Sequence, residues 1–157
     1  MARIYIDTSF ISACVSTRVD PASVYRRATS LQWLESERSK HEVGVSAEVF
    51  AELDNSNYPN RAIALSLAET IPLLEIDQRC LAFASVLVKE LVMPGPVTGD
   101  AVHVAVACLH QCEFLLSWNI RHLANPNKVV HLRTVCLRAG YLSPSIITPE
   151  SLWSANQ

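Results

Sequence analysis

The 157-residue sequence has few charged residues, few glycines and almost no net charge. Lys and Arg total 13 against 15 Asp and Glu, charged residues make up 18% of the chain and hydrophobic residues 50%. A charged fraction below the ~25% typical of soluble domains excludes a disordered or highly solvated protein. The net charge of −2 and the pI near 6.2 exclude a general polyanion binder. Any nucleic-acid contact must therefore come from local patches or a bound metal.

The sequence also lacks the marks of a membrane or secreted protein. Its longest uncharged stretch within a helical pattern, 101–112, is far shorter than the ~20 apolar residues that span a bilayer. The N-terminus lacks the apolar region of a signal peptide. The five cysteines are odd in number and form no Cys-x-x-Cys pair, which indicates reduced thiols rather than disulfides. We therefore expect a cytoplasmic protein that contacts no membrane.

Short apolar runs alternate with helical patterns along the chain. Strands are expected at 3–6, 43–45, 73–76, 114–118 and 146–147, and helices at 20–38, 46–53, 60–69, 77–91, 100–111 and 126–139. Parallel neighbouring strands require crossover helices, so this alternation predicts an α/β fold with a short central parallel sheet flanked by helices, in three layers. Because no repeat or linker interrupts the pattern, residues 1–157 are expected to form a single domain.

Polar residues lie at the predicted strand ends and helix starts, where parallel α/β sheets bind their ligands. Asp7 follows the strand 3–6, Asn119 follows the strand 114–118, and Asp100 begins a helix that is otherwise apolar. Each has a structural alternative: a helix cap for Asp7, a turn residue for Asn119 and a solvated first-turn acid for Asp100. Glu48 and Glu52 are four residues apart and share a helix face, where both would ordinarily be solvated. As a set, such oxygen ligands suit Mg²⁺ or Mn²⁺, the ions of phosphodiester hydrolysis.

The order and spacing of these motifs resemble those of PIN-domain nucleases, in particular the VapC-type toxins of bacterial and archaeal toxin–antitoxin pairs. The resemblance extends over about residues 4–152, and its specificity lies in the ordered series rather than in any one motif. The matching stretches are Tyr5-Ile6-Asp7-Thr8-Ser9, Val45-Ser46 with Glu52 six residues after the serine, Gly99-Asp100-Ala101-Val102-His103-Val104-Ala105, Leu115-Leu116-Ser117-Trp118-Asn119-Ile120-Arg121-His122-Leu123-Ala124-Asn125 and Thr148-Pro149-Glu150-Ser151-Leu152.

The resemblance implies a PIN-like fold and a metal-dependent endoribonuclease, a hydrolase that acts as the toxin of a toxin–antitoxin pair. Its partners would be an RNA substrate, a cognate antitoxin and a second copy of the chain. Asp7, Glu52 and Asp100 would bind Mg²⁺ or Mn²⁺ directly or through water. Asn119 stands where the family usually has a fourth acid, and it would orient a water or an outer ligand as part of the catalytic set.

Four further residues are candidate substrate contacts: Thr8, Ser9, Arg121 and His122. Arg121 and His122 follow Asn119 closely, where they would meet an RNA phosphate, with solvated loop positions as the alternative. His103 lies three residues after Asp100 and is either a hydrogen-bond partner of the site or a packed core histidine. The pair Arg26-Arg27 is interpreted as helix surface, and the tryptophans 33, 118 and 153 as packing.

Two other classes of protein remain open. The first is a catalytically degenerate PIN-like module that binds RNA or protein and has lost catalysis through the change at Asn119. The second is a flavodoxin-like or receiver-like signalling domain, which also carries acids at strand ends. Against the second class, Asp7 has no adjacent acidic partner, and no lysine follows a late strand.

Overall fold

The computed structural model describes the chain except residues 56, 58–59, 124 and 154–157. The described part contains a four-stranded sheet in the order β2-β1-β3-β4. The strands are β1 (Arg3–Ile6), β2 (Glu42–Gly44), β3 (Phe114–Leu116) and β4 (Ser145–Ile147). All neighbours are parallel, with Ile6 of β1 opposite Leu116 of β3. The carboxyl ends of the strands therefore meet along one edge of the sheet.

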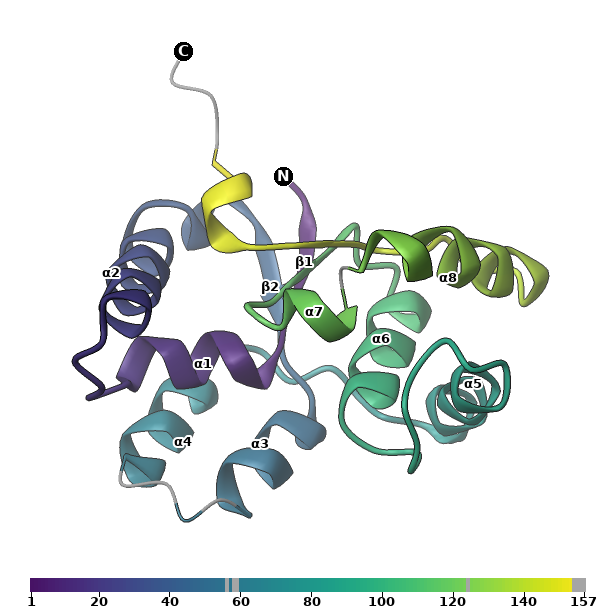
Figure 1. The fold of residues 1–157 in the computed structure, drawn as a ribbon, viewed down its shortest axis with the longest axis horizontal. Coiled ribbons are helices and arrows are strands. Elements are labelled where there is room, and N and C mark those ends of the chain that lie inside the picture. The colour runs from purple at the N-terminus through teal and green to yellow at the C-terminus, as the bar shows by residue number, and fades with distance from the viewer. Residues whose placement is uncertain (56, 58–59, 124, 154–157) are drawn as a thin grey trace.

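Helices lie on both sides of the sheet, so the predicted three-layer α/β/α arrangement is confirmed (Figure 1). One side carries α1 (Thr8–Val15), α2 (Pro21–Ser36), α3 (Ala47–Asp54) and α4 (Arg61–Glu69), which pack against one another. The other side carries α5 (Gln78–Lys89), α6 (Asp100–Leu109) and α8 (Pro126–Arg138). The short helix α7 (Ile120–Leu123) follows β3, and the 3₁₀ turns η1 (Arg38–Lys40) and η2 (Pro149–Ser151) lie after α2 and β4.

Aspartate side chains cap the N-termini of two helices, at the first residues of the ranges expected from the sequence. Asp20 accepts a hydrogen bond from Ser23 N at the start of α2, and Asp77 accepts one from Cys80 N at the start of α5. The helix α6 is buried from Ala101 to Cys108 between the sheet and α5. Its burial follows from its composition, since it is apolar on nearly every face.

The structure corrects the prediction of a strand at 73–76. Leu73 makes only an isolated bridge to Val45, and the chain then leaves the sheet. The carbonyl of Glu75 is hydrogen-bonded to His110 Nε2 at 2.8 Å instead of to a strand. Asp77 already caps α5, so no residues remain to extend the pairing.

The predicted strand 114–118 is also shorter than expected, because β3 ends at Leu116. Two helices, α1 and α7, were not predicted. The first begins directly after Asp7, and the second begins directly after Asn119, three residues beyond the end of β3. No helix among the described residues is long and apolar enough to cross a membrane. The single domain at 1–157 stays a prediction, and its last four residues lie outside the described part.

Candidate active site at the carboxyl ends of the strands

Asp7 closes β1 and is both a helix cap and a buried acid. Its side chain is 2% exposed, and Oδ1 accepts hydrogen bonds from Phe10 N at 3.1 Å and Ser9 Oγ at 2.7 Å. The hydroxyl of Ser117 donates to Oδ2 from the end of β3. Burial raises the pKa of Asp7 above its ordinary value, because these donors and the charge of His103 only partly offset the loss of water.

Glu52 reaches the same edge of the sheet from α3. Its Oε1 accepts a hydrogen bond from Thr8 Oγ1 at 2.9 Å and is paired with His103 Nε2. Burial alone would raise the pKa of Glu52, but the hydrogen bond and charge of His103 outweigh burial and lower it. Glu52 is therefore a charged group held in place by two partners.

His103 is a buried link between the acids and the core. Its Nδ1 lies 2.6 Å from the Tyr5 hydroxyl, which in turn lies 2.7 Å from Ser46 Oγ. Both interpretations of His103 from the sequence hold, because the ring is 1% exposed and also bonds to Glu52. Ser46, the first residue of the helix expected at 46–53, precedes α3 in the structure. Its side chain makes no cap hydrogen bond and binds Tyr5 instead.

The charges around His103 explain its protonation preference. Burial alone would lower the pKa of His103, but the hydrogen bond to Glu52 and the negative charges of Asp7, Glu52 and Asp100 outweigh burial and raise it. The imidazole therefore responds to all three predicted acids at once.

Asp100 and Asn119 complete the site from α6 and from the loop after β3. Asn119 Nδ2 donates to Asp100 Oδ2 at 3.4 Å, and Asn119 N donates to Ser117 Oγ at 2.9 Å. Because Ser117 also donates to Asp7, Asn119 is connected to two of the predicted acids. Asn119 O accepts from Leu123 N, so the residue also begins the turn of α7.

The loop before Asp100 is held by Glu48, which the sequence left as a solvated acid. Glu48 Oε1 accepts a hydrogen bond from Gly99 N at 2.7 Å. Gly99 has a φ of 58°, a conformation that favours glycine, and a Cβ placed there would lie 3.9 Å from Glu52 Oε2. The two glutamates thus share a helix face that is turned towards the start of α6.

The predicted substrate contacts divide into two kinds. Thr8 and Ser9 point into the site, where they bind Glu52 and Asp7. Arg121 is exposed on α7, close in sequence to Asn119. The side chain of His122 lies outside the described part of the structure. Sequence reasoning missed Tyr5, Ser46 and Ser117 as members of the network.

The donor chemistry of the site fits a hard divalent cation. Asp7, Asp100 and Asn119 belong to one hydrogen-bonded network, and Glu52 belongs to a second one with Thr8 and His103. All four supply oxygen atoms, the ligands that Mg²⁺ and Mn²⁺ prefer. No group of three or more His, Cys, Asp and Glu among the described residues is arranged to hold an ion by itself. An ion here would bind partly through water, which suits Mg²⁺ because it retains several of its waters.

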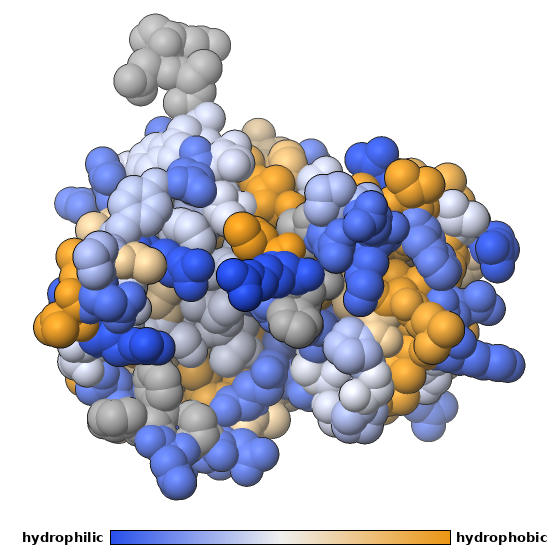
Figure 2. Space-filling view, in the orientation of Figure 1, coloured by the Kyte–Doolittle hydropathy of each residue, from blue (hydrophilic) through white to orange (hydrophobic). Residues whose placement is uncertain are grey.

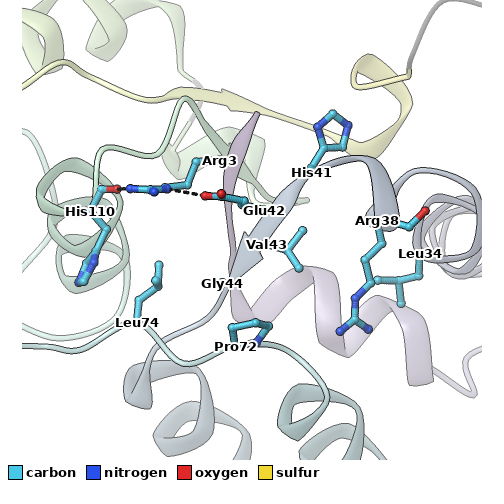
Figure 3. Close-up of a pocket in the computed structure, with 11 residues that line it drawn as sticks. Arg3, Leu34, Arg38, His41, Glu42, Val43, Gly44, Pro72, Leu74 and His110 are labelled. Atoms are coloured by element: carbon cyan, nitrogen blue, oxygen red, sulfur yellow. Dashed lines mark hydrogen bonds and ion pairs between the residues drawn. The ribbon is translucent and has the colours of Figure 1, made fainter. Parts of the chain in front are cut away.

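A different pocket, of about 700 Å³, lies at the amino ends of β1 and β2 (Figure 3). Arg3 is central to it and pairs with Glu42 at 3.0 Å while donating to the carbonyl of His110 at 3.0 Å. A further cavity of about 800 Å³ lies at the amino ends of β3 and β4. Neither contains any of the predicted acids.

No protein-family model matches this sequence, and no curated protein matches it. Solved structures do share its fold. VapBC2 from Rickettsia felis, solved bound to a DNA fragment from its promoter, gives a TM-score of 0.59 at 13% identity, covering 93% of this chain and 98% of that chain. FitAcB from Neisseria gonorrhoeae gives a TM-score of 0.55 at 16% identity, covering 95% of this chain and 99% of that chain. VapBC-1 from nontypeable Haemophilus influenzae gives a TM-score of 0.57 at 13% identity, covering 94% of this chain and 98% of that chain. The chain therefore has the PIN-like α/β/α fold of these VapC and FitB proteins.

Proposed function

We propose that the protein is a metal-dependent endoribonuclease and the toxin of a toxin–antitoxin pair. The observation that carries this proposal is the hydrogen-bonded network at the carboxyl edge of the sheet, which connects Asp7 with Asp100 through Ser117 and Asn119. The fold supports it, because the solved structures that share this fold are VapBC and FitAB toxin–antitoxin complexes.

Asp7, Glu52 and Asp100 would hold Mg²⁺ or Mn²⁺, directly or through water. Such an ion lowers the pKa of a bound water and offsets charge that develops on the scissile phosphate. The residues of the chain orient the ligands: Ser9 and Ser117 fix the Asp7 carboxylate, and His103 and Thr8 fix Glu52. No side chain is required as the nucleophile.

Asn119 sets the charge of the proposed site. An amide contributes no negative charge, so the site has three formal negative charges where four acids would supply four. This weakens the attraction for a second cation and favours a single ion. Asn119 would act by directing Asp100, to which it donates, or a water beside it.

The alternative function is a catalytically degenerate module that binds RNA or protein, and Asn119 in the place of a fourth acid is the observation that favours it. An RNA-cleavage time course with Mn²⁺, and with EDTA as control, separates the two. Cleavage by the wild type that EDTA abolishes supports the enzyme. An inert wild type whose Asn119→Asp variant cleaves RNA would establish the degenerate module.

A cognate antitoxin and a second copy of the chain are the proposed protein partners. Hydrophobic surface gathers over α5 and α8 in Figure 2. The exposed large apolar side chains of these helices and of the loops after them are Leu81, Val86, Leu91, Val97, Val130, Leu137 and Leu142. Such surface favours a protein partner. Light scattering of the pure protein tests the dimer, and co-purification with the product of a neighbouring small reading frame tests the antitoxin.

The proposed cellular location is the cytoplasm. All five cysteines are free and buried, which fits a reducing compartment. Fractionation of cells that produce the protein at its native level tests this location directly.

A further inference from the structure

A groove of about 420 Å³ lies between α1 and α2 and reaches Asn119. Its walls carry two arginines, Arg18 and Arg26, and the indole of Trp118. Most of its remaining lining consists of hydroxyl groups, from Ser9, Ser12, Ser16 and Ser23. Most of the residues that line the groove are therefore polar or basic, whereas Asp7 and Asp100 lie on the other side of Asn119.

Arg26 is held over the face of Trp118, with its guanidinium carbon 5.5 Å from the ring centroid. The indole itself is fixed, because its Nε1 donates to Ser30 Oγ at 2.8 Å and its ring meets Tyr25 edge-on. Trp118 is 8% exposed, whereas Arg26 is exposed. The ring thus supports the arginine and leaves the outer face of the guanidinium open to solvent.

The described residues provide no acidic partner for Arg26, whereas Arg18 pairs with Asp20 at 3.4 Å. A guanidinium without a carboxylate partner retains its donors for a ligand, and phosphate oxygens match its geometry. Holding the side chain in place beforehand reduces the entropy lost when the ligand binds. Arg26 is therefore well placed to bind a phosphate.

The lining of the groove discriminates between two classes of ligand. A helical antitoxin segment would require an apolar groove for its hydrophobic face. Serine hydroxyls and arginines instead suit the negative phosphates and the sugar oxygens of a nucleic-acid backbone. Trp118 also connects the groove to the site, because it precedes Asn119 and its backbone N donates to Ser9 Oγ at 2.9 Å.

We propose that this groove binds the phosphate backbone of the RNA strand on one side of the scissile bond, with Arg26 as the phosphate-binding residue. Trp118 is the positioning residue that holds Arg26 beside Asn119. The inference rests on the proposed function, since it identifies the route by which an RNA strand reaches the acids. It also assigns a role to Arg26 and Trp118, which the sequence pattern left as helix surface and packing.

The test measures RNA binding apart from cleavage. A fluorescein-labelled single-stranded RNA decamer is titrated by anisotropy against Asp100→Asn protein without divalent ions, at several salt concentrations. Adding Arg26→Ala should weaken binding about five- to tenfold and reduce the salt slope by about 0.7. The matched control is Arg27→Ala, which removes the same charge from the next residue of α2 and lies outside the groove lining; it should change affinity less than twofold.

Equal losses from Arg26→Ala and Arg27→Ala would overturn the proposal, because the effect would then be one of general charge. Tighter binding of a poly-glutamate decamer than of the RNA, with the same dependence on Arg26, would also overturn it and identify a site for acidic peptides. Trp118→Phe should also weaken RNA binding. Arg26→Lys should bind RNA more tightly than Arg26→Ala but more weakly than the protein with Arg26. Melting curves check that each variant folds. If the groove does not bind RNA, the proposed endoribonuclease activity is unaffected. If the wild type does not cleave RNA but still binds it through Arg26, only the proposed activity is refuted.

Discussion

The cavities at the two ends of the sheet differ in volume, and the side chains near them differ in chemistry. Cavities of about 700 and 800 Å³ lie at the amino ends of the strands, while the groove at the carboxyl end measures about 420 Å³. The predicted acids nevertheless lie at the carboxyl end, where α1 begins two residues after β1 and α7 begins four residues after β3. In a parallel sheet, the helix N-termini and the polar residues that precede them lie at the carboxyl ends of the strands, and the predicted acids are there for this reason. Cavity volume alone would point to the amino ends of the strands, away from the predicted acids.

The charged groups at the two ends are also held differently. At the amino end Arg3 and Glu42 form an ion pair whose side chains are 47% and 58% exposed, a type that contributes about 0–1 kcal/mol. At the carboxyl end Asp7 and His103 are buried and joined to several partners. A change at the carboxyl end should therefore affect both activity and stability, whereas a change at the amino end should affect neither strongly.

The largest expected difference between the ends is in RNA cleavage. Asp100→Asn preserves the shape of the side chain and removes a carboxylate, so it should lower the cleavage rate with Mn²⁺ at least about 100-fold. Glu42→Gln makes the same chemical change at the amino end and should leave the rate within about twofold of wild type. Similar losses of cleavage rate in both variants would refute the proposed difference between the two ends of the sheet.

The next largest effect concerns Asn119. Asn119→Ala removes the donor to Asp100 and should lower the cleavage rate about 10- to 100-fold. Asn119→Asp preserves the geometry and adds a negative charge, so Mn²⁺ affinity measured by calorimetry should rise while activity survives. Full activity of Asn119→Ala would reduce this residue to a turn asparagine and leave a site of three acids.

Metal binding should also stabilise the fold. The like charges of Asp7, Glu52 and Asp100 repel one another until a cation binds. At a hundredfold excess of Mn²⁺ over its Kd, linkage adds about 2.7 kcal/mol to the free energy of unfolding, or about 5–10 °C in the melting temperature. Asp100→Asn should lose most of this shift and Glu42→Gln should retain it. A wild-type melting curve that millimolar Mn²⁺ leaves unchanged would count against the site.

The smallest effect is on the stability of the metal-free protein. Tyr5→Phe removes a buried hydroxyl that is bonded to Ser46 and His103, and should lower the free energy of unfolding by about 1–3 kcal/mol. Arg3→Ala removes the exposed pair to Glu42 and should cost about 1 kcal/mol or less. Urea unfolding at neutral pH measures both, and a larger loss from Arg3→Ala would reverse the expected order.

The main elements could be predicted from sequence because their signals are local. The helices expected from residues 20 and 77 begin beside the capping side chains of Asp20 and Asp77, and β1 covers the predicted residues. The strand expected at 73–76 was wrong because His110 takes the Glu75 carbonyl, a contact 35 residues apart in sequence. Composition alone gives no sign of such a contact.

Contacts between residues distant in sequence also limited what could be predicted of the site. Asp7, Asp100 and Asn119 could be selected because each lies at the boundary of a predicted element. Tyr5 and Ser117 belong to a strand and its end, and their roles come from bonds to residues 98 and 110 positions away. Trp118 was interpreted as packing because its contacts with Arg26 and Ser30 are equally non-local.

The most direct test of the account is the position of Mn²⁺ in crystals of the protein soaked with this ion. The anomalous difference map should show its strongest peak at the carboxyl edge of the sheet, among Asp7, Glu52 and Asp100, with part of the coordination supplied by water. A strongest peak at the amino end, beside His41, Glu42 or His110, would contradict the account. So would a map with no peak at the acids in crystals whose protein cleaves RNA with Mn²⁺.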